Sequence, residues 1–166
     1  LVTVNTAAIP ADLAAAELFG SARGAFTGAD SNSPGYFRQA QGGSLFLDEV
    51  GDMPAEIQPQ LLRALQQREI QSVGGTIHRI DLRVISATDA PLEGEGSDFK
   101  AALLHRLGTH VIDLVPLREH PEDIGELALH MFRACAALHE DRALLPDENS
   151  SEIEIAGWAE LFHRLL

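Results

Sequence analysis

Two adjacent acids, Asp48 and Glu49, directly follow a short apolar run at residues 44–47. A run of this length without polar alternation predicts a strand that is buried on both faces of a parallel sheet. Open α/β sheets bind their ligands at the carboxyl ends of such strands. In phosphoryl-transfer enzymes, one carboxylate at that position holds Mg²⁺ and a second orients the attacking water. The two acids therefore indicate nucleotide chemistry or, as the alternative, the polar turn that ends many strands.

A second stretch, residues 20–34, is rich in Gly, Ala, Ser and Asn and contains a single aromatic residue, Phe26. This composition predicts a flexible loop. Taken alone, it favours a phenylalanine that packs back onto the surface of the protein.

The composition limits the class of protein. With 166 residues, of which 45% are hydrophobic, the chain is long enough for one domain, or one and a fraction, with a core of Leu, Ile, Val and Ala. No apolar run approaches a membrane span and no signal-peptide pattern opens the chain, so we expect a cytoplasmic protein without membrane contact. The net charge of -13 argues against direct binding to a phosphate backbone. Any DNA binding would then use a domain outside these residues.

Lys100 is the one lysine of the chain, and it lies in the sequence Asp-Phe-Lys-Ala-Ala. A Walker A loop requires Gly-x-x-x-x-Gly-Lys followed by Ser or Thr, so the sequence as given lacks this phosphate cradle. Cys135 lies among Ala and Leu and reads as a small buried hydrophobe. The histidines show no metal-ligand spacing, so no metal site is expected beyond Mg²⁺ at Asp48.

Several motifs occur along the chain in a set order. Glu-Leu-Phe-Gly at 17–20 is followed by Gly-Ala-Phe-Thr-Gly-Ala at 24–29, Gly-Tyr-Phe at 35–37, Gly-Gly at 42–43 and the Asp-Glu pair at 48–49, a Walker B element. With these motifs the chain resembles the AAA+ domain of the bacterial enhancer-binding proteins, the sigma-54-dependent transcription activators. The resemblance extends over nearly the whole chain.

The resemblance implies an α/β fold: a parallel-sheet AAA+ core of the P-loop type, here without its first strand and P-loop, followed by the start of a helical lid. Residues 1–117 would form the partial core and residues 118–166 the partial lid, which would end before the sensor II arginine.

Local patterns place the individual elements. Strands are predicted at residues 1–5, 44–47, 69–73, 76–80, 82–87 and 111–115. Helices are predicted at residues 10–19, from 52–54 onward with Pro59 as an alternative first turn, from a cap at Asp98 to 107, at 124–138 and at 155–166, with a loop at 141–154.

The resemblance also implies roles for single residues. Asp48 would bind Mg²⁺ with ATP, Glu49 would polarise the attacking water, and Thr88 and Ile124 would contact the nucleotide, Thr88 as sensor I. Asn5 would hold Glu49 in an inactive rotamer; alternatively it caps a strand end.

Arg106 would reach the active site of the neighbouring subunit in a homo-oligomeric ring, where it would stabilise charge on the γ-phosphate. The alternative is an arginine that solvates the end of an amphipathic helix.

The hexapeptide would contact sigma-54 RNA polymerase, mainly through Phe26 and Thr27. Its members are Gly24, Ala25, Phe26, Thr27, Gly28 and Ala29. A second loop, around the Gly-Gly pair at 74–75, would move with it.

The chain departs from the family pattern at several positions. Ser21 and Ala22 stand where the family commonly has His and Glu, Ser72 and Lys100 where it usually has Arg, and Asp89 where it usually has Asn. Two functions remain open: an ATP-driven remodeller of the polymerase closed complex, whose ATPase is silent in this chain without Walker A, or a non-catalytic sigma-54-binding module.

Overall fold

The computed structural model describes residues 1–94 and 97–138. The chain divides into two compact units, Leu1–Val111 and Ile112–Leu166, and each is described by itself. The predicted loop at 141–154 and helix at 155–166 lie outside the described residues. The unit boundary falls upstream of the one expected after Leu117, and the division into a partial core and a partial lid stays a prediction.

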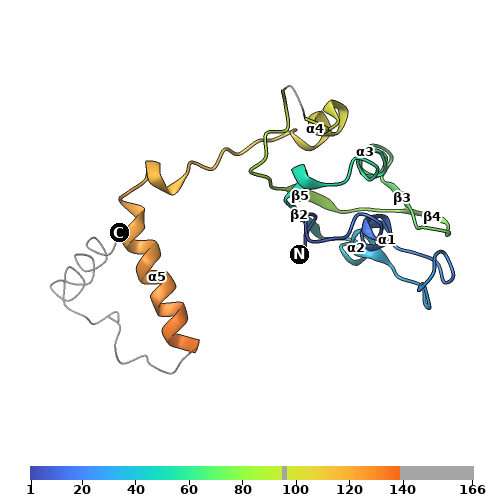
Figure 1. Ribbon diagram of the computed structural model, residues 1–166, viewed down its shortest axis with the longest axis horizontal. Helices are drawn as coiled ribbons and strands as arrows, with labels where there is room; N and C mark the ends of the chain where they lie inside the picture. The colour runs from blue at the N-terminus through green and yellow to red at the C-terminus, as the bar shows by residue number, and fades with distance from the viewer. Residues whose placement is uncertain (95–96, 139–166) are drawn as a thin grey trace. The chain divides into compact units, whose positions relative to one another are not determined.

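A three-stranded parallel sheet forms the centre of the first unit (Figure 1). Its strands are β1 (Val2–Asn5), β2 (Ser44–Asp48) and β5 (Arg83–Ser86), in the order β1-β2-β5. The register pairs Asn5 with Asp48 and Leu47 with Ser86, so the carboxyl ends of all three strands meet at one edge. This sheet confirms the predicted α/β class.

The central strand β2 is less buried than its apolar sequence predicted. Leu45 and Leu47 are fully buried and belong to the core, but Phe46 is only partly buried. Side chains alternate between the two faces of a strand, so Phe46 points away from Leu45 and Leu47. Ile85, which pairs with Phe46 and shares its face, is 43% exposed. In the described residues, the predicted burial of both faces is therefore complete on the face of Leu45 and Leu47 and only partial on the face of Phe46.

Two short helices flank the loop at residues 20–34. Helix α1 (Ala14–Phe19) starts later than predicted, because residues 10–13 form tight turns in which the amide of Leu13 donates to the carbonyl of Pro10 at 2.9 Å. Helix α2 (Gly35–Gln39) was not predicted. The rings of Phe19 and Phe37 stack with centroids 5.4 Å apart, which joins the two helices in the core.

Helix α3 (Gln58–Gln67) also starts later than the predicted position at 52–54. Residues Val50–Asp52 form a separate 3₁₀ turn, η1, and Pro59 occupies the first turn of α3, as the alternative interpretation held. The following helix, α4 (Ala101–Leu107), begins after Lys100 and not at Asp98, and Lys100 provides no side-chain cap.

A hairpin follows α3. Strands β3 (Glu69–Gln71) and β4 (Ile77–Arg79) pair antiparallel, as predicted, although both are shorter than expected. The hairpin turn, residues 72–76, lies at the same end of the unit as the loop between α1 and α2 (Figure 1).

The predicted strand at residues 111–115 is wrong. These residues form no strand in the described part of the chain, and Ile112 and Leu114 are 83% and 89% exposed. The hydrophobic run has the composition of a strand, but a strand needs a paired neighbour for its backbone groups. The 3₁₀ turn η2 (Leu117–Glu119) and helix α5 (Asp123–Leu138) follow, and α5 agrees with the predicted helix. None of the helices in the described residues has the length and apolarity to cross a bilayer.

Candidate functional site

The carboxylate turn, residues 48–52, begins where β2 ends. Asp48 is the last residue of β2, and its Oδ1 accepts the amide hydrogen of Glu49 at 3.1 Å. Glu49 has a left-handed backbone with φ of 53°. Such a conformation is uncommon for a residue with a side chain and occurs often at functional sites. The turn directs the chain away from the sheet immediately after the two acids.

Thr6 anchors the turn from the neighbouring strand. Its amide donates to the carbonyl of Asp48 at 2.9 Å, and its hydroxyl lies 2.9 Å from the same oxygen and 2.6 Å from the carbonyl of Glu49. The side chain of Thr6 is buried. The sequence analysis missed this residue. The available signal was a hydroxyl directly after β1, the neighbour of the strand that ends in Asp48.

Thr88 lies against Gly51 of the carboxylate turn, and its predicted role at the nucleotide stays a prediction. The amide of Val50 donates to the carbonyl of Ala87 at 3.0 Å. A Cβ atom on Gly51 would lie 2.7 Å from the Thr88 hydroxyl oxygen, so only glycine permits this approach. The Thr88 hydroxyl accepts the amide hydrogen of Ala90 at 3.1 Å.

Negative charge accumulates at the turn. The nearby charge of Asp89 raises the pKa of the Glu49 carboxyl, and partial burial, Asp48 and Asp52 act in the same direction. Like charges disfavour the ionised carboxylate, and a bound cation would relieve this repulsion.

The chemistry of these residues fits Mg²⁺ held together with phosphates. The described residues contain no group of three or more His, Cys, Asp or Glu side chains that could hold a metal. Protein-bound Mg²⁺ commonly takes one or two carboxylates and completes its shell with phosphate and water oxygens. Asp48 suits that arrangement and no stand-alone metal cage.

Asn5 uses its side chain locally. Its Oδ1 accepts the amide hydrogens of Ala7 at 2.9 Å and Ala8 at 3.2 Å. This geometry corresponds to the alternative in which Asn5 caps the end of its strand. Asn5 pairs with Asp48 in the register of the parallel sheet. A role for the Asn5 side chain in holding Glu49 in an inactive rotamer stays a prediction.

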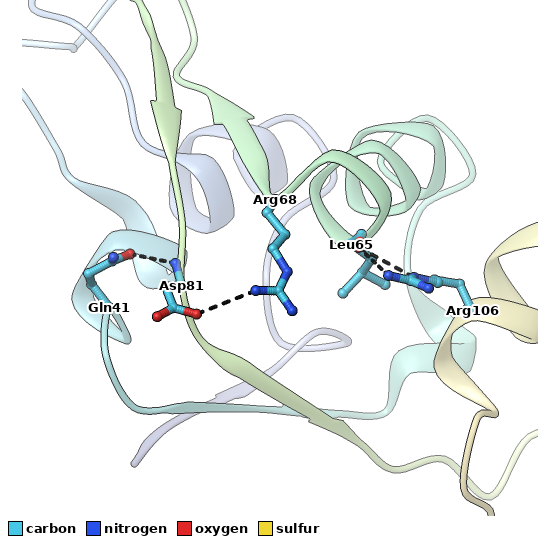
Figure 2. A network of polar contacts seen from close by, with 5 residues as sticks. All are labelled: Gln41, Leu65, Arg68, Asp81 and Arg106. Carbon is cyan, nitrogen blue, oxygen red and sulfur yellow. Dashed lines mark hydrogen bonds and ion pairs between the residues drawn. The ribbon is translucent and has the colours of Figure 1, made fainter.

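Arg106 bonds to α3 of its own chain (Figure 2). Its Nε and Nη2 donate to the carbonyl of Leu65 at 3.3 and 2.9 Å. The guanidinium thus satisfies a backbone acceptor in the last turn of α3. It also borders an open cavity of about 330 Å³, together with Arg68, Ile80, Val84 and His110. Ile124, the remaining predicted nucleotide contact, lies in α5 of the second unit.

The same view shows a neighbouring contact network. Arg68 has a left-handed backbone with φ of 55°, and its side chain lies 3.7 Å from Asp81. Both side chains are well exposed, so this ion pair contributes little stability. The amide of Asp81 donates to the Gln41 side chain at 3.1 Å (Figure 2).

The glycine loop, residues 20–34, is closed at its stem and open at its tip. Ser21 and Ser33 exchange two backbone hydrogen bonds of 3.0 and 2.9 Å. Near the tip, the amide of Gly24 donates to the carbonyl of Ala29 at 2.8 Å. Phe26 is 39% exposed and Thr27 is exposed as well. Phe26 is therefore partly covered and partly open to solvent, which leaves both the packed phenylalanine and the contact residue as predictions.

Backbone atoms tie the glycine loop to the hairpin turn. The amide of Ala22 donates to the carbonyl of Val73 at 2.9 Å, and the amide of Val73 donates to the carbonyl of Gly20 at 2.8 Å. A Cβ atom on Gly74 would lie 2.9 Å from the Cβ of Ala25. These contacts involve no long side chain, so the two loops touch even though Ser72 replaces the usual arginine.

The parallel sheet, the carboxylate turn at its carboxyl edge and the loop inserted between α1 and α2 define an α/β domain of the AAA+ type. The solved structure of NtrX from Brucella abortus matches 99% of this chain with a TM-score of 0.74 and 31% identity, and the match covers 39% of the NtrX chain. Structures of the same NtrX in complex with ATP and with ADP match equally well, with TM-scores of 0.74 and 0.73.

The chain belongs to the family of sigma-54 interaction domains, whose model matches residues 1–113. The transcriptional activator HyfR of Escherichia coli is 46% identical over 163 residues, which are 95% of this chain and 24% of HyfR. The transcriptional regulator NtrC of Salmonella typhimurium is 44% identical over 161 residues, which are 95% of this chain and 34% of NtrC. The chain thus spans about a quarter to a third of the curated relatives it matches.

Proposed function

We propose that this chain forms the sigma-54-contacting part of a transcription activator that remodels the closed complex of RNA polymerase at the expense of ATP. The observation that carries the proposal is the combination, in one family member, of a carboxylate turn at the sheet edge and an exposed glycine loop tied to the hairpin turn. Membership in the sigma-54 interaction family supports the partner, and the NtrX complexes with ATP and ADP support nucleotide use.

In this proposal the nucleotide site forms around the carboxylate turn. Asp48 holds Mg²⁺ on the phosphates, and Glu49, in its ionised form, orients and polarises the attacking water. Thr88 reports on the γ-phosphate from the adjacent strand end, and Ile124 contacts the nucleotide. Asn5 restrains Glu49 until the partner is engaged.

Arg106 acts between subunits of a homo-oligomeric ring. To reach the phosphates of a neighbouring copy, its guanidinium exchanges the Leu65 carbonyl for phosphate oxygens, which are stronger partners because they are charged. Removal of such an arginine typically costs about 10³-fold or more in rate.

The tip of the glycine loop contacts sigma-54, with Phe26 and Thr27 as the principal contacts. An exposed aromatic ring buries a large apolar area at a small entropic cost, which suits a contact residue. Gly24, Ala25, Gly28 and Ala29 keep the loop narrow and allow it to change height.

The proposal extends to three further properties. The protein is cytoplasmic, DNA is bound by a domain outside these residues, and the 166-residue chain by itself turns over no ATP because it lacks the Walker A lysine. A second candidate is a non-catalytic sigma-54-binding module. It is favoured by Ser21, Ser72, Asp89 and Lys100, which stand where the family commonly has other residues.

The test uses the native protein that carries this sequence, with ATP hydrolysis and sigma-54 binding measured in parallel. Glu49→Gln is expected to abolish hydrolysis, and Phe26→Ala is expected to abolish sigma-54 binding while hydrolysis persists. Phe132→Ala, which removes an aromatic ring of similar exposure in α5, serves as the matched control. Binding that needs Phe26 but is indifferent to ATP and to Glu49 would instead establish the binding module.

A further inference from the structure

Gln58 is a buried polar side chain that joins two separate parts of the first unit. The residue is 2% exposed at the start of α3. Its Nε2 donates to the carbonyl of Met53 at 3.3 Å, and its Oε1 accepts the amide hydrogen of Lys100 at 2.8 Å. The second bond joins residues 42 positions apart in the sequence. Both polar ends of this amide are therefore used, one on each neighbour.

One of these neighbours is the carboxylate turn. Met53 directly follows η1, and its amide donates back to the carbonyl of Val50 at 3.3 Å, while the amide of Asp52 donates to the carbonyl of Glu49 at 3.0 Å. Met53 itself is buried in the core. A displacement of Glu49 and its turn is thus passed to Met53, which is the acceptor of the Gln58 bond.

The other neighbour is the helix that carries Arg106. Lys100 is the N-cap of α4 and has no side-chain cap of its own, so Gln58 takes the place of a cap. At the opposite end of α4, Arg106 bonds to Leu65 in the last turn of α3. Helix α3 therefore holds α4 at both ends, through one amide and one guanidinium.

Helix α4 depends on these two attachments for its position. A helix of seven residues has little stability of its own, so tertiary contacts determine where it lies. Leu103 is its one fully buried side chain, and Leu107 packs partly against the core, so the polar bonds at the two ends act together with this apolar contact to fix the tilt of the helix.

We propose that Gln58 is a positioning residue that sets the orientation of α4, and with it Arg106, relative to the carboxylate turn. The inference rests on the proposed function, in which Glu49 and Arg106 act at the ATP sites on the two sides of one subunit. A change at Glu49 in one site is passed through Met53 and Gln58 to the arginine that serves the next site.

The experiment is amide hydrogen exchange and side-chain NMR on the native protein that carries this sequence, with Gln58→Met, a change that keeps the volume and removes both polar atoms. Exchange of the Lys100 amide is expected to accelerate about tenfold or more, because its hydrogen bond is lost. The Arg106 Nε resonance is expected to shift and its exchange to accelerate as well. A local capping role would change Lys100 and leave Arg106 as in the unchanged chain, and that result would overturn the proposal.

The matched control is Gln60→Met, an exposed glutamine on the same helix, which is expected to change neither signal. If Gln58→Met prevents folding, Arg106→Met provides the reciprocal test, since Arg106 is exposed and its loss leaves the core intact. Lys100 exchange is then expected to rise severalfold, and exchange within twofold of the unchanged chain would refute the coupling. These measurements involve neither ATP nor sigma-54, so their outcome is separate from that of the proposed function.

Discussion

The carboxylate turn at residues 48–52 is held by the buried Thr6 hydroxyl in addition to main-chain bonds, whereas the glycine loop at residues 20–34 is joined to the hairpin turn by main-chain bonds and is exposed at its tip. Thr6, directly after β1, bonds to the turn through its hydroxyl, and Gly51 of the turn packs closely against Thr88. Gln58 bonds to Met53, the residue that follows the turn. The glycine loop has only main-chain bonds to the hairpin turn and small residues at the contact.

The difference corresponds to two physical requirements. Groups that act on a reacting atom must be held closely, and buried hydrogen bonds provide that precision because breaking one leaves a desolvated polar group. The proposed function asks the glycine loop to bind a partner and to change height, and such a loop must break and remake its contacts at low cost. Main-chain bonds near the surface, with water ready to replace them, meet that need.

The largest effect is expected where the glycine loop joins the core. A Cβ atom on Gly35, which has φ of 70°, would overlap the backbone of Gly20 and Phe19. Gly35→Ala is therefore expected to lower the free energy of unfolding by about 3 kcal/mol or more, from strain and overlap together. Gly24→Ala has similar φ but open space and should cost only about 1–2 kcal/mol. Urea unfolding of the two variants measures the difference; equal losses would show that the junction is not rigid.

The next effect concerns the hydrogen bonds from Thr6 to the carboxylate turn. Thr6→Val keeps the shape of the side chain and removes the hydroxyl that bonds to Asp48 and Glu49. The free energy of unfolding is expected to fall by about 1–3 kcal/mol, because the Glu49 carbonyl loses its hydroxyl donor while the Asp48 carbonyl keeps only the Thr6 amide. Thr3→Val, an exposed change in the same strand, should stay within about 0.5 kcal/mol of the unchanged chain. If Thr6→Val leaves the free energy of unfolding unchanged, the carboxylate turn keeps its conformation without the Thr6 hydroxyl.

A smaller effect tests the contact between the glycine loop and the hairpin turn. Gly74→Ala introduces a Cβ that meets Ala25, in addition to the strain of φ at 66°. Gly42→Ala carries the same kind of strain, at φ of 73°, in open space. The difference between the two variants isolates the contact and is expected to be about 1 kcal/mol. Only Gly74→Ala should accelerate hydrogen exchange at the Ala22 and Val73 amides, and equal exchange in both variants would exclude this contact as the link.

The smallest expected effect is electrostatic. Asp89 is the first cause of the raised pKa of Glu49, so Asp89→Asn is expected to lower that pKa toward its ordinary value. Glu49 then stays ionised down to a lower pH. NMR titration of the Glu49 side-chain carboxyl in the two proteins measures the shift, with the exposed and distant Asp12→Asn as control. If the pKa of Glu49 stays unchanged in Asp89→Asn, its raised value comes from burial, Asp48 and Asp52 and not from Asp89.

The sequence predicted the parts of the molecule whose signal is local. The apolar run before Asp48 identified β2, the Gly-Gly pair identified the hairpin, and a periodic apolar pattern identified α5. The failures have physical reasons. Residues 111–115 have the composition of a strand and no neighbour to pair with, and Pro10 begins a turn because its carbonyl accepts an early bond from Leu13.

The supporting residues of the site, Thr6 and Gln58, could not be predicted from the sequence for a different reason. Gln58 and Gln60 stand on either side of Pro59 in the same helix, and only the fold decides that one is buried and bonded at both ends while the other is exposed. Thr6 likewise looks like any polar residue that ends a strand. Their roles depend on contacts between elements far apart in the sequence, and a single sequence carries no local mark of them.

The main-chain bonds between Ala22 and Val73 have a consequence for how this protein can diverge. Every amino acid except proline offers the same amide and carbonyl, so these positions can exchange side chains without loss of the two bonds. Substitutions such as Ala22→Ser or Val73→Ile are then expected to change the stability of the protein little. The surface around the glycine loop can change while the two main-chain hydrogen bonds that attach the loop are kept.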